Sequence, residues 1–142
     1  MKEIDVSDLL GIWFHDVEVS RINIDYIRRE VELEYTLPIG WWNSPNREGL
    51  TEGEKKGKLL FTGLLFIVIE PPDENYPYED NGGIEITGEG SATATEFKEK
   101  YAAHLAKMPQ NLPEDVFLHY FYVVDWNTFI FVAARDAVFQ PG

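Results

Sequence analysis

The amino-acid sequence predicts an α+β fold, in which one α-helix packs against a curved antiparallel β-sheet or partly open barrel of about six strands. Three patterns predict it. Apolar and polar residues alternate in the N-terminal part, two strongly apolar runs flank a turn near the C-terminus, and residues 93–107 have a helical period. The 142 residues fit a single domain, 1–142, because one core at this size already buries roughly 70% of the unfolded surface.

Two neighbouring strands are expected in the N-terminal part. Residues 31–37 alternate Val, Leu and Tyr with Glu and Thr, which predicts one buried and one wet face. In the segment before it, apolar residues change parity between Val19 and Ile22, which predicts a β-bulge near Ser20 and Arg21. The link between the strands has no glycine, so a longer loop or a type I turn is expected instead of a primed two-residue turn.

The middle of the chain predicts two further strands. Residues 59–69 are apolar at both parities, which is typical of a strand covered on both faces, and Gly63 marks a bend or bulge within it. Residues 84–87 predict a short strand that Gly88 and Gly90 end. The segments between these strands are rich in proline, glycine and polar residues, as surface connections are.

A helix and a hairpin are expected in the C-terminal part. Phe97, Tyr101 and Leu105 are spaced to share one face of a helix over about 93–107. Residues 116–124 and 129–134 flank a polar turn, which predicts a strongly apolar antiparallel hairpin.

The charge balance narrows the possible partners. Twenty-five acidic residues against twelve basic ones give a net charge of −13, which argues against a nucleic-acid-binding or anionic-membrane-binding surface. The chain has no cysteine, as is common in a reducing compartment. Acids occupy the N-terminal positions where a signal peptide has a basic start, and the longest apolar run is too short to span a bilayer. We therefore expect a cytoplasmic protein with neither nucleic-acid nor membrane partners.

An acidic, aromatic segment is the first candidate binding surface. Eight acids and no basic residue lie between Lys58 and Lys98, and this local negative field can steer a basic partner, hold a cation such as Ca²⁺, or simply keep the surface solvated. Loop aromatic residues nearby are favoured anchors in protein interfaces. The candidate partner-binding residues are Glu70, Asp73, Glu74, Tyr76, Tyr78, Glu79 and Asp80, with Trp41 and Trp42 flanking them.

A histidine and two acids at the start of the first strand form a second candidate. Alternation places Asp16 and Glu18 on one face and His15 on the other, so a catalytic or metal site requires a residue from elsewhere, such as His119. The structural alternative is a histidine that hydrogen-bonds near the start of the strand. The sequence has no HExxH pair, no GxSxG elbow and no phosphate-binding glycine loop. We therefore expect no catalytic residue, no metal and no cofactor.

The stretch Trp-Phe-His-Asp-Val-Glu-Val at residues 13–19 runs directly into the expected strand pair. It resembles small bacterial proteins, some classed as immunity proteins of polymorphic toxin systems, that open with a Phe-His-Asp-Ala-Glu-Val-like stretch followed by a strand hairpin. The resemblance covers residues 1–37, and Val17 stands where the family has alanine. It implies a compact β-rich domain that binds and neutralises a toxin. The positions it marks are Phe14, His15, Asp16 and Glu18.

We therefore expect a non-enzymatic, immunity-like protein-binding module whose acidic, aromatic surface binds a basic protein partner. The alternative is a small-molecule-binding or small-molecule enzyme domain with a cavity between the curved sheet and the helix, in which His15 and His119 are the polar groups. A third hypothesis is an assembly subunit that dimerises through a self-complementary apolar patch.

Overall fold

The structure is a computed structural model, and it describes residues 6, 17–38, 54–76, 83–91 and 112–141. Val6 is in a helical conformation, and all eight elements of the described residues are strands. Their bounds are β1 Val17–Asp25, β2 Glu30–Pro38, β3 Glu54–Thr62, β4 Phe66–Ile69, β5 Ile84–Ser91, β6 Phe117–Val123, β7 Thr128–Ala134 and β8 Asp136–Pro141.

The strands form one antiparallel sheet in the order β4-β7-β6-β5-β1-β2-β3-β8. The α+β prediction is therefore wrong, because the described chain is all-β and has eight strands where about six were expected. The predicted helix, about 93–107, lies outside the described residues. The strand count was too low for two reasons: the run 59–69 divides into β3 and β4, and β8 was not foreseen.

The sheet folds back on itself at a corner where two pairs of strands meet. β3 runs into β4 through Gly63, and β7 runs into β8 through Arg135, so that the same two chain segments pair on both sides of the corner. Gly63 has a φ of 60°, a left-handed conformation that glycine adopts without the steric penalty of a Cβ. Leu65 donates its backbone N–H to Ala133 O, and Arg135 donates to Thr62 O, which continues the ladder across the corner.

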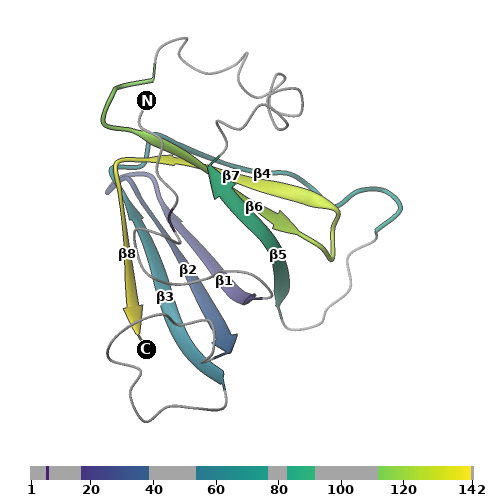
Figure 1. Cartoon of the computed structure of the whole chain (residues 1–142). Helices are drawn as coiled ribbons and strands as arrows, with labels where there is room; N and C mark the ends of the chain where they lie inside the picture. The colour runs from purple at the N-terminus through teal and green to yellow at the C-terminus, as the bar shows by residue number, and fades with distance from the viewer. Residues whose placement is uncertain (1–5, 7–16, 39–53, 77–82, 92–111, 142) are drawn as a thin grey trace.

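As a result, β1, β2, β3 and β8 form one wall of the molecule, and β4, β6 and β7 form the other (Figure 1). β5 joins the walls on the side opposite the corner by pairing with both β1 and β6.

The β1–β2 hairpin has the bulge and the turn that the sequence predicts. The register shifts between Val19 and Arg21, at the predicted change of parity. The turn holds four residues between the strands, and Arg29 has a φ of 58°. The Asp25 carboxylate accepts the backbone N–H groups of Ile27 and Arg28, which fixes the conformation of the turn.

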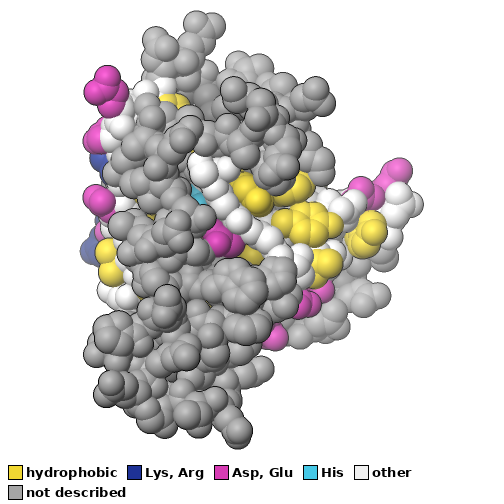
Figure 2. Space-filling view, viewed as in Figure 1, with side chains coloured by type: hydrophobic (Ala, Val, Ile, Leu, Met, Phe, Trp, Pro, Cys, Tyr) yellow, Lys and Arg dark blue, Asp and Glu magenta, His cyan; other side chains and the backbone are white. Residues whose placement is uncertain are grey.

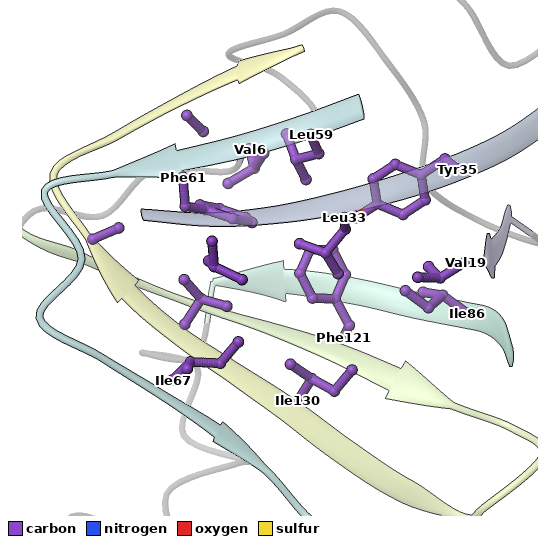
Figure 3. Close-up of a cluster of buried hydrophobic side chains, with 14 of the residues drawn as sticks. Val6, Val19, Leu33, Tyr35, Leu59, Phe61, Ile67, Ile86, Phe121 and Ile130 are labelled. Carbon is purple, nitrogen blue, oxygen red and sulfur yellow. The ribbon is translucent and has the colours of Figure 1, made fainter. Parts of the chain in front are cut away.

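The main hydrophobic core lies between the two walls (Figure 3). It forms because alternate residues of each strand point to the same face, and removing each large apolar side chain from water contributes roughly 1.5–3 kcal/mol. Its largest fully buried apolar members come from β2, β3, β5 and β6 and from the β3–β4 corner: Leu33, Leu59, Phe61, Leu64, Ile86, Phe117 and Phe121.

A second apolar cluster lies on the outer face of the β4-β7-β6 wall. All seven residues of β7 are buried, so this strand is covered on both faces. Aromatic rings pack against each other here, with the centroids of Phe129 and Phe131 5.8 Å apart and those of Tyr122 and Phe129 5.1 Å apart. Partly buried members such as Tyr120 complete the cluster. Figure 2 shows hydrophobic side chains at the surface over β6 and β7.

Candidate functional site

Three polar side chains from three different strands lie inside the main core. Tyr35 on β2 is 1% exposed, His119 on β6 is 0% exposed, and the Glu89 side chain on β5 is 6% exposed. Removing such groups from water is unfavourable unless they interact with one another. Buried ionisable groups brought together from distant strands are a recognised mark of functional sites.

A β-bulge in β5 turns Glu89 into the core. Ile86 lies opposite Val123, and both belong to the core, but the register shifts before Gly88. Beyond the shift, Glu89 lies opposite the core residue Phe121. In a regular strand, a residue three positions after Ile86 faces the opposite side. The extra residue in the bulge therefore changes Glu89 from an outward to an inward position.

The imidazole of His119 lies close to the Glu89 carboxylate, among aromatic rings. Its Nε2 is 2.7 Å from Glu89 Oε2, so the two side chains form a close polar contact. The His119 ring lies 4.7 Å from that of Phe121, edge to face, and 6.5 Å from that of Phe61. These apolar neighbours lower the local dielectric and strengthen the attraction between the two polar groups.

Tyr35 brings a neutral hydroxyl to the same cluster. Burial raises the pKa of the Tyr35 phenol well above its ordinary value, and the negative charge of Glu89 raises this pKa further. Both effects disfavour the phenolate, so Tyr35 keeps its proton throughout the physiological pH range. The cluster thus combines a carboxylate, an imidazole and a phenol in an apolar environment. Such a set can hold and exchange a proton.

Sequence reasoning found one of these three residues and missed two. His119 was named as a polar group of a possible pocket, and the structure places it in the core beside Glu89. Tyr35 was read only as part of the alternating pattern of its strand. The sequence signal for Glu89 was its position between Gly88 and Gly90, because glycine within a strand often marks a bulge or a close approach of another group. The structure has such an approach at Gly90, where an added β-carbon would lie only 3.2 Å from the Tyr120 ring.

The structure gives two acids of the candidate partner-binding surface internal roles. Glu70 accepts the backbone N–H of Phe129 through Oε1 at 2.9 Å, which ties the end of β4 to β7. Asp73 accepts the N–H of Asn75 and donates its own N–H to Trp126 O. These carboxylates stabilise the segment that follows β4, so they are less available to a partner than the sequence suggests.

The other candidates are either exposed or outside the described residues. Glu74 and Tyr76 are exposed, and Glu18 is exposed on β1, opposite Thr36 of β2 and Glu85 of β5. Outside the described residues lie Trp41, Trp42, Tyr78, Glu79, Asp80, Phe14, His15 and Asp16.

A row of acidic side chains lies on the outer face of β2. In the sequence these residues indicated a strand and were not identified as a binding surface. Glu30, Glu32 and Glu34 alternate with buried residues, so their carboxylates share one face. Lys58 of β3 lies between two of them, with its Nζ 3.7 Å from Glu32 and 3.9 Å from Glu34. Figure 2 shows acidic and basic side chains along the side formed by this wall.

The β1–β2 turn beside this row presents apolar side chains to solvent. Ile27 is 94% exposed and Tyr26 is also exposed, although Asp25 holds the turn in one conformation. We call the acidic row and this turn together the β1–β2 face; it comprises Tyr26, Ile27, Glu30, Glu32 and Glu34.

Within the described ranges, no three His, Asp or Glu side chains are grouped so that they could hold a metal ion. The same part of the chain contains no helix of the length and apolarity that a membrane crossing requires. Comparison of the chain with models of protein families, with curated proteins and with solved structures finds no match in any of the three.

Proposed function

We propose that this protein is a non-enzymatic, immunity-like binding module that uses its β1–β2 face to bind a basic protein partner. The acidic row on β2 is the observation that supports this proposal most directly. Three glutamates two residues apart in one strand are spaced by roughly 7 Å, which is within a physiological screening length of about 8 Å. Lys58 offsets one of the three negative charges, and the remaining field attracts a basic partner before contact.

The β1–β2 turn complements this charge with an apolar anchor. Binding energy in protein interfaces concentrates in a few apolar or aromatic side chains surrounded by polar ones. Ile27 and Tyr26 offer such side chains next to the acids, and the hydrogen bonds that Asp25 accepts from the backbone have already ordered the turn. A preordered turn loses little conformational entropy when it binds.

The test compares two variants of equal charge. In one, the row is neutralised by Glu30→Gln, Glu32→Gln and Glu34→Gln, and in the control three exposed acids elsewhere are neutralised by Glu74→Gln, Glu85→Gln and Glu114→Gln. Each immobilised protein is exposed to a lysate of its source organism, eluted with stepped salt, and the eluate is identified by mass spectrometry. We expect the same basic protein from the wild type and the control and its loss from the row variant. Equal recovery from all three would refute the assignment of the surface.

The buried cluster supports a second candidate function, a small-molecule site with acid–base chemistry. The specific observation is the 2.7 Å approach of His119 to Glu89 beside the neutral Tyr35 hydroxyl. A ligand in contact with this cluster would raise the melting temperature of the wild type and not that of Glu89→Gln, which keeps the shape and removes the charge. A ligand screen that finds no compound with this difference would eliminate the candidate.

A further inference from the structure

The β1–β2 turn contains a backbone conformation that its residue type does not favour. Among the described residues, three have a positive φ: Arg29 at 58°, Asn127 at 50° and Gly63 at 60°. Glycine has no Cβ, and asparagine tolerates the left-handed region because its short polar side chain bonds locally. Arginine has neither property. Arg29 is therefore the position of the three at which the side chain is retained against the preference of the backbone.

The fold gives the Asn127 side chain a role that it does not give to the side chain of Arg29. Asn127 accepts the Tyr122 hydroxyl at 2.7 Å. Arg29 contributes its carbonyl, which accepts the backbone N–H of Leu64 at 2.9 Å, a bond that any residue could make. Its side chain is exposed and forms no ion pair or hydrogen bond within the described part of the chain. A strained backbone whose side chain has no internal contact is characteristic of a functional position.

Arg29 also places a positive charge beside the acidic row. The neighbouring Arg28 is partly offset, because its Nε lies 4.0 Å from Asp25 Oδ2. No such carboxylate faces Arg29 among the described residues. A uniformly basic partner would be attracted by the glutamates and repelled by this guanidinium. A partner that binds the β1–β2 face therefore needs an acidic group opposite Arg29.

Ile27, two residues before Arg29, provides the apolar part of the same contact. Its side chain is 94% exposed on a turn that Asp25 holds in one conformation. An exposed aliphatic side chain binds most strongly in a pocket whose rim excludes water, and an ionic hydrogen bond at that rim is strengthened by the lower dielectric. A guanidinium binds a carboxylate through two parallel N–H groups, which fixes direction as well as charge.

We propose that Arg29 is the specificity-determining residue of the β1–β2 face, and that its guanidinium binds a carboxylate at the rim of an apolar pocket that receives Ile27 on the basic partner. The acidic row attracts basic proteins in general, and Arg29 selects the one that carries this carboxylate, because it repels the others. This inference rests on the proposed function, since it concerns the same face and the same partner.

Two substitutions at position 29 separate binding from folding. Arg29→Gln removes the charge and keeps the strained backbone, whereas Arg29→Gly removes both. In thermal unfolding, Arg29→Gln should melt with the wild type and Arg29→Gly about 2–4 °C above it. The binding probe is the basic protein that the wild type recovers from lysate, titrated by calorimetry. Both variants should raise its Kd at least about 30-fold, as expected of a residue that dominates an interface.

Lys56→Gln is the matched control for charge. Lys56 is an exposed cation of β3 that pairs with Thr36, six positions along the strand from the Glu30–Thr62 pair beside the turn. It should bind the partner within about twofold of the wild type, because a charge change at this distance is largely screened. An equal loss for Lys56→Gln would overturn the inference, since net charge and not the position of Arg29 would then decide binding.

Two results at position 29 would also overturn it. Wild-type binding by Arg29→Gly would mean that the partner does not contact the guanidinium, and a lower melting temperature would mean that the side chain serves the fold. The triple glutamine variant of the acidic row keeps this failure apart from that of the proposed function. If the row variant loses the partner and both Arg29 variants keep it, only the role of Arg29 is refuted. If the wild type itself recovers no basic protein, both are refuted.

Discussion

Replacing Glu89 with alanine should lower the free energy of unfolding by about 1–3 kcal/mol. The substitution leaves His119 fully buried without the carboxylate that lies 2.7 Å from its Nε2. Leaving a buried polar group without its partner costs about 1–3 kcal/mol, because the remaining group keeps its desolvation penalty and loses its compensation. The lost packing of the side chain acts in the same direction.

Urea denaturation followed by circular dichroism measures this change. Glu85→Ala is the matched control: it lies on the same strand, its side chain is exposed, and its hydrogen bond to Asp125 uses the backbone N–H that alanine retains. We expect this control to remain within about 0.5 kcal/mol of the wild type. Glu89→Gln should lie between the two, because an amide can still interact with the imidazole. If Glu89→Ala unfolds at the same urea concentration as Glu85→Ala, the carboxylate is not coupled to His119 and the buried cluster is not a unit.

Three further outcomes are expected. The pKa of Tyr35 is raised above its ordinary value of 10.0, so its contribution to stability is complete below pH 10 and is lost as the pH rises toward the folded-state pKa. Between pH 9 and 11 the wild type should therefore lose up to about 1.4 kcal/mol per pH unit more than Tyr35→Phe in urea titrations, and parallel slopes would contradict the assigned burial. Gly57→Ala should destabilise the protein by about 1–3 kcal/mol, because the added Cβ would overlap the Phe139 ring. Gly88→Ala is the control, since its added Cβ would meet only Tyr122 Cβ at 3.8 Å, and equal melting temperatures of the two variants would exclude the close packing at Gly57. Asn127 has a φ of 50° and accepts a hydrogen bond from the Tyr122 hydroxyl at 2.7 Å. In thermal unfolding, Asn127→Ala should therefore lower the stability by about 1–2 kcal/mol and Asn127→Gly by less, because glycine adopts a positive φ without strain. A larger loss for Asn127→Gly would refute backbone strain as the cause.

The local features of the N-terminal hairpin were predictable from the sequence. The alternation from Val31 onward fixes which side chains of β2 are buried, and the change of apolar parity between Val19 and Ile22 locates the bulge. The predicted bend at Gly63 and the predicted C-terminal hairpin, β6–β7, are also confirmed. In each case the pattern depends on neighbours in the sequence, which a single chain displays directly.

The wrong predictions concern interactions between distant segments. The strand at residues 84–87 was expected to end at Gly88, but β5 continues to Ser91 because β6 pairs with it and the Tyr120 ring packs against Gly90. β8 has only two inward side chains, Ala137 and Phe139, too few to show a period. Its partner strand ends at Thr62, 74 residues before Asp136.

His119 of the candidate site could be identified from the sequence, but its buried partner Glu89 could not. His119 stands out in the sequence because it interrupts an apolar strand. The burial of Glu89 depends on a one-residue bulge that reverses the face of β5, and the alternation of the sequence does not show where that bulge lies. The row of glutamates on β2 was visible in the sequence as a solvent-facing side of the strand. That Glu70 and Asp73 instead bond to the backbone of their own chain became clear only from the hydrogen bonds.

The corner at Gly63 and Arg135 also has a consequence for the order of folding. The hairpins β1–β2 and β6–β7 join residues close in the sequence, so each can begin from a local turn. By contrast, β3 pairs with β8 across a long stretch of chain. The paired residues are separated by 74 positions at Thr62–Asp136 and by 84 at Gly57–Pro141. Closing so long a loop is entropically unfavourable before the contacts form, and sheets dominated by such pairs fold in roughly milliseconds to seconds. The two walls are therefore joined at the corner late in folding, when nearly the whole chain is present.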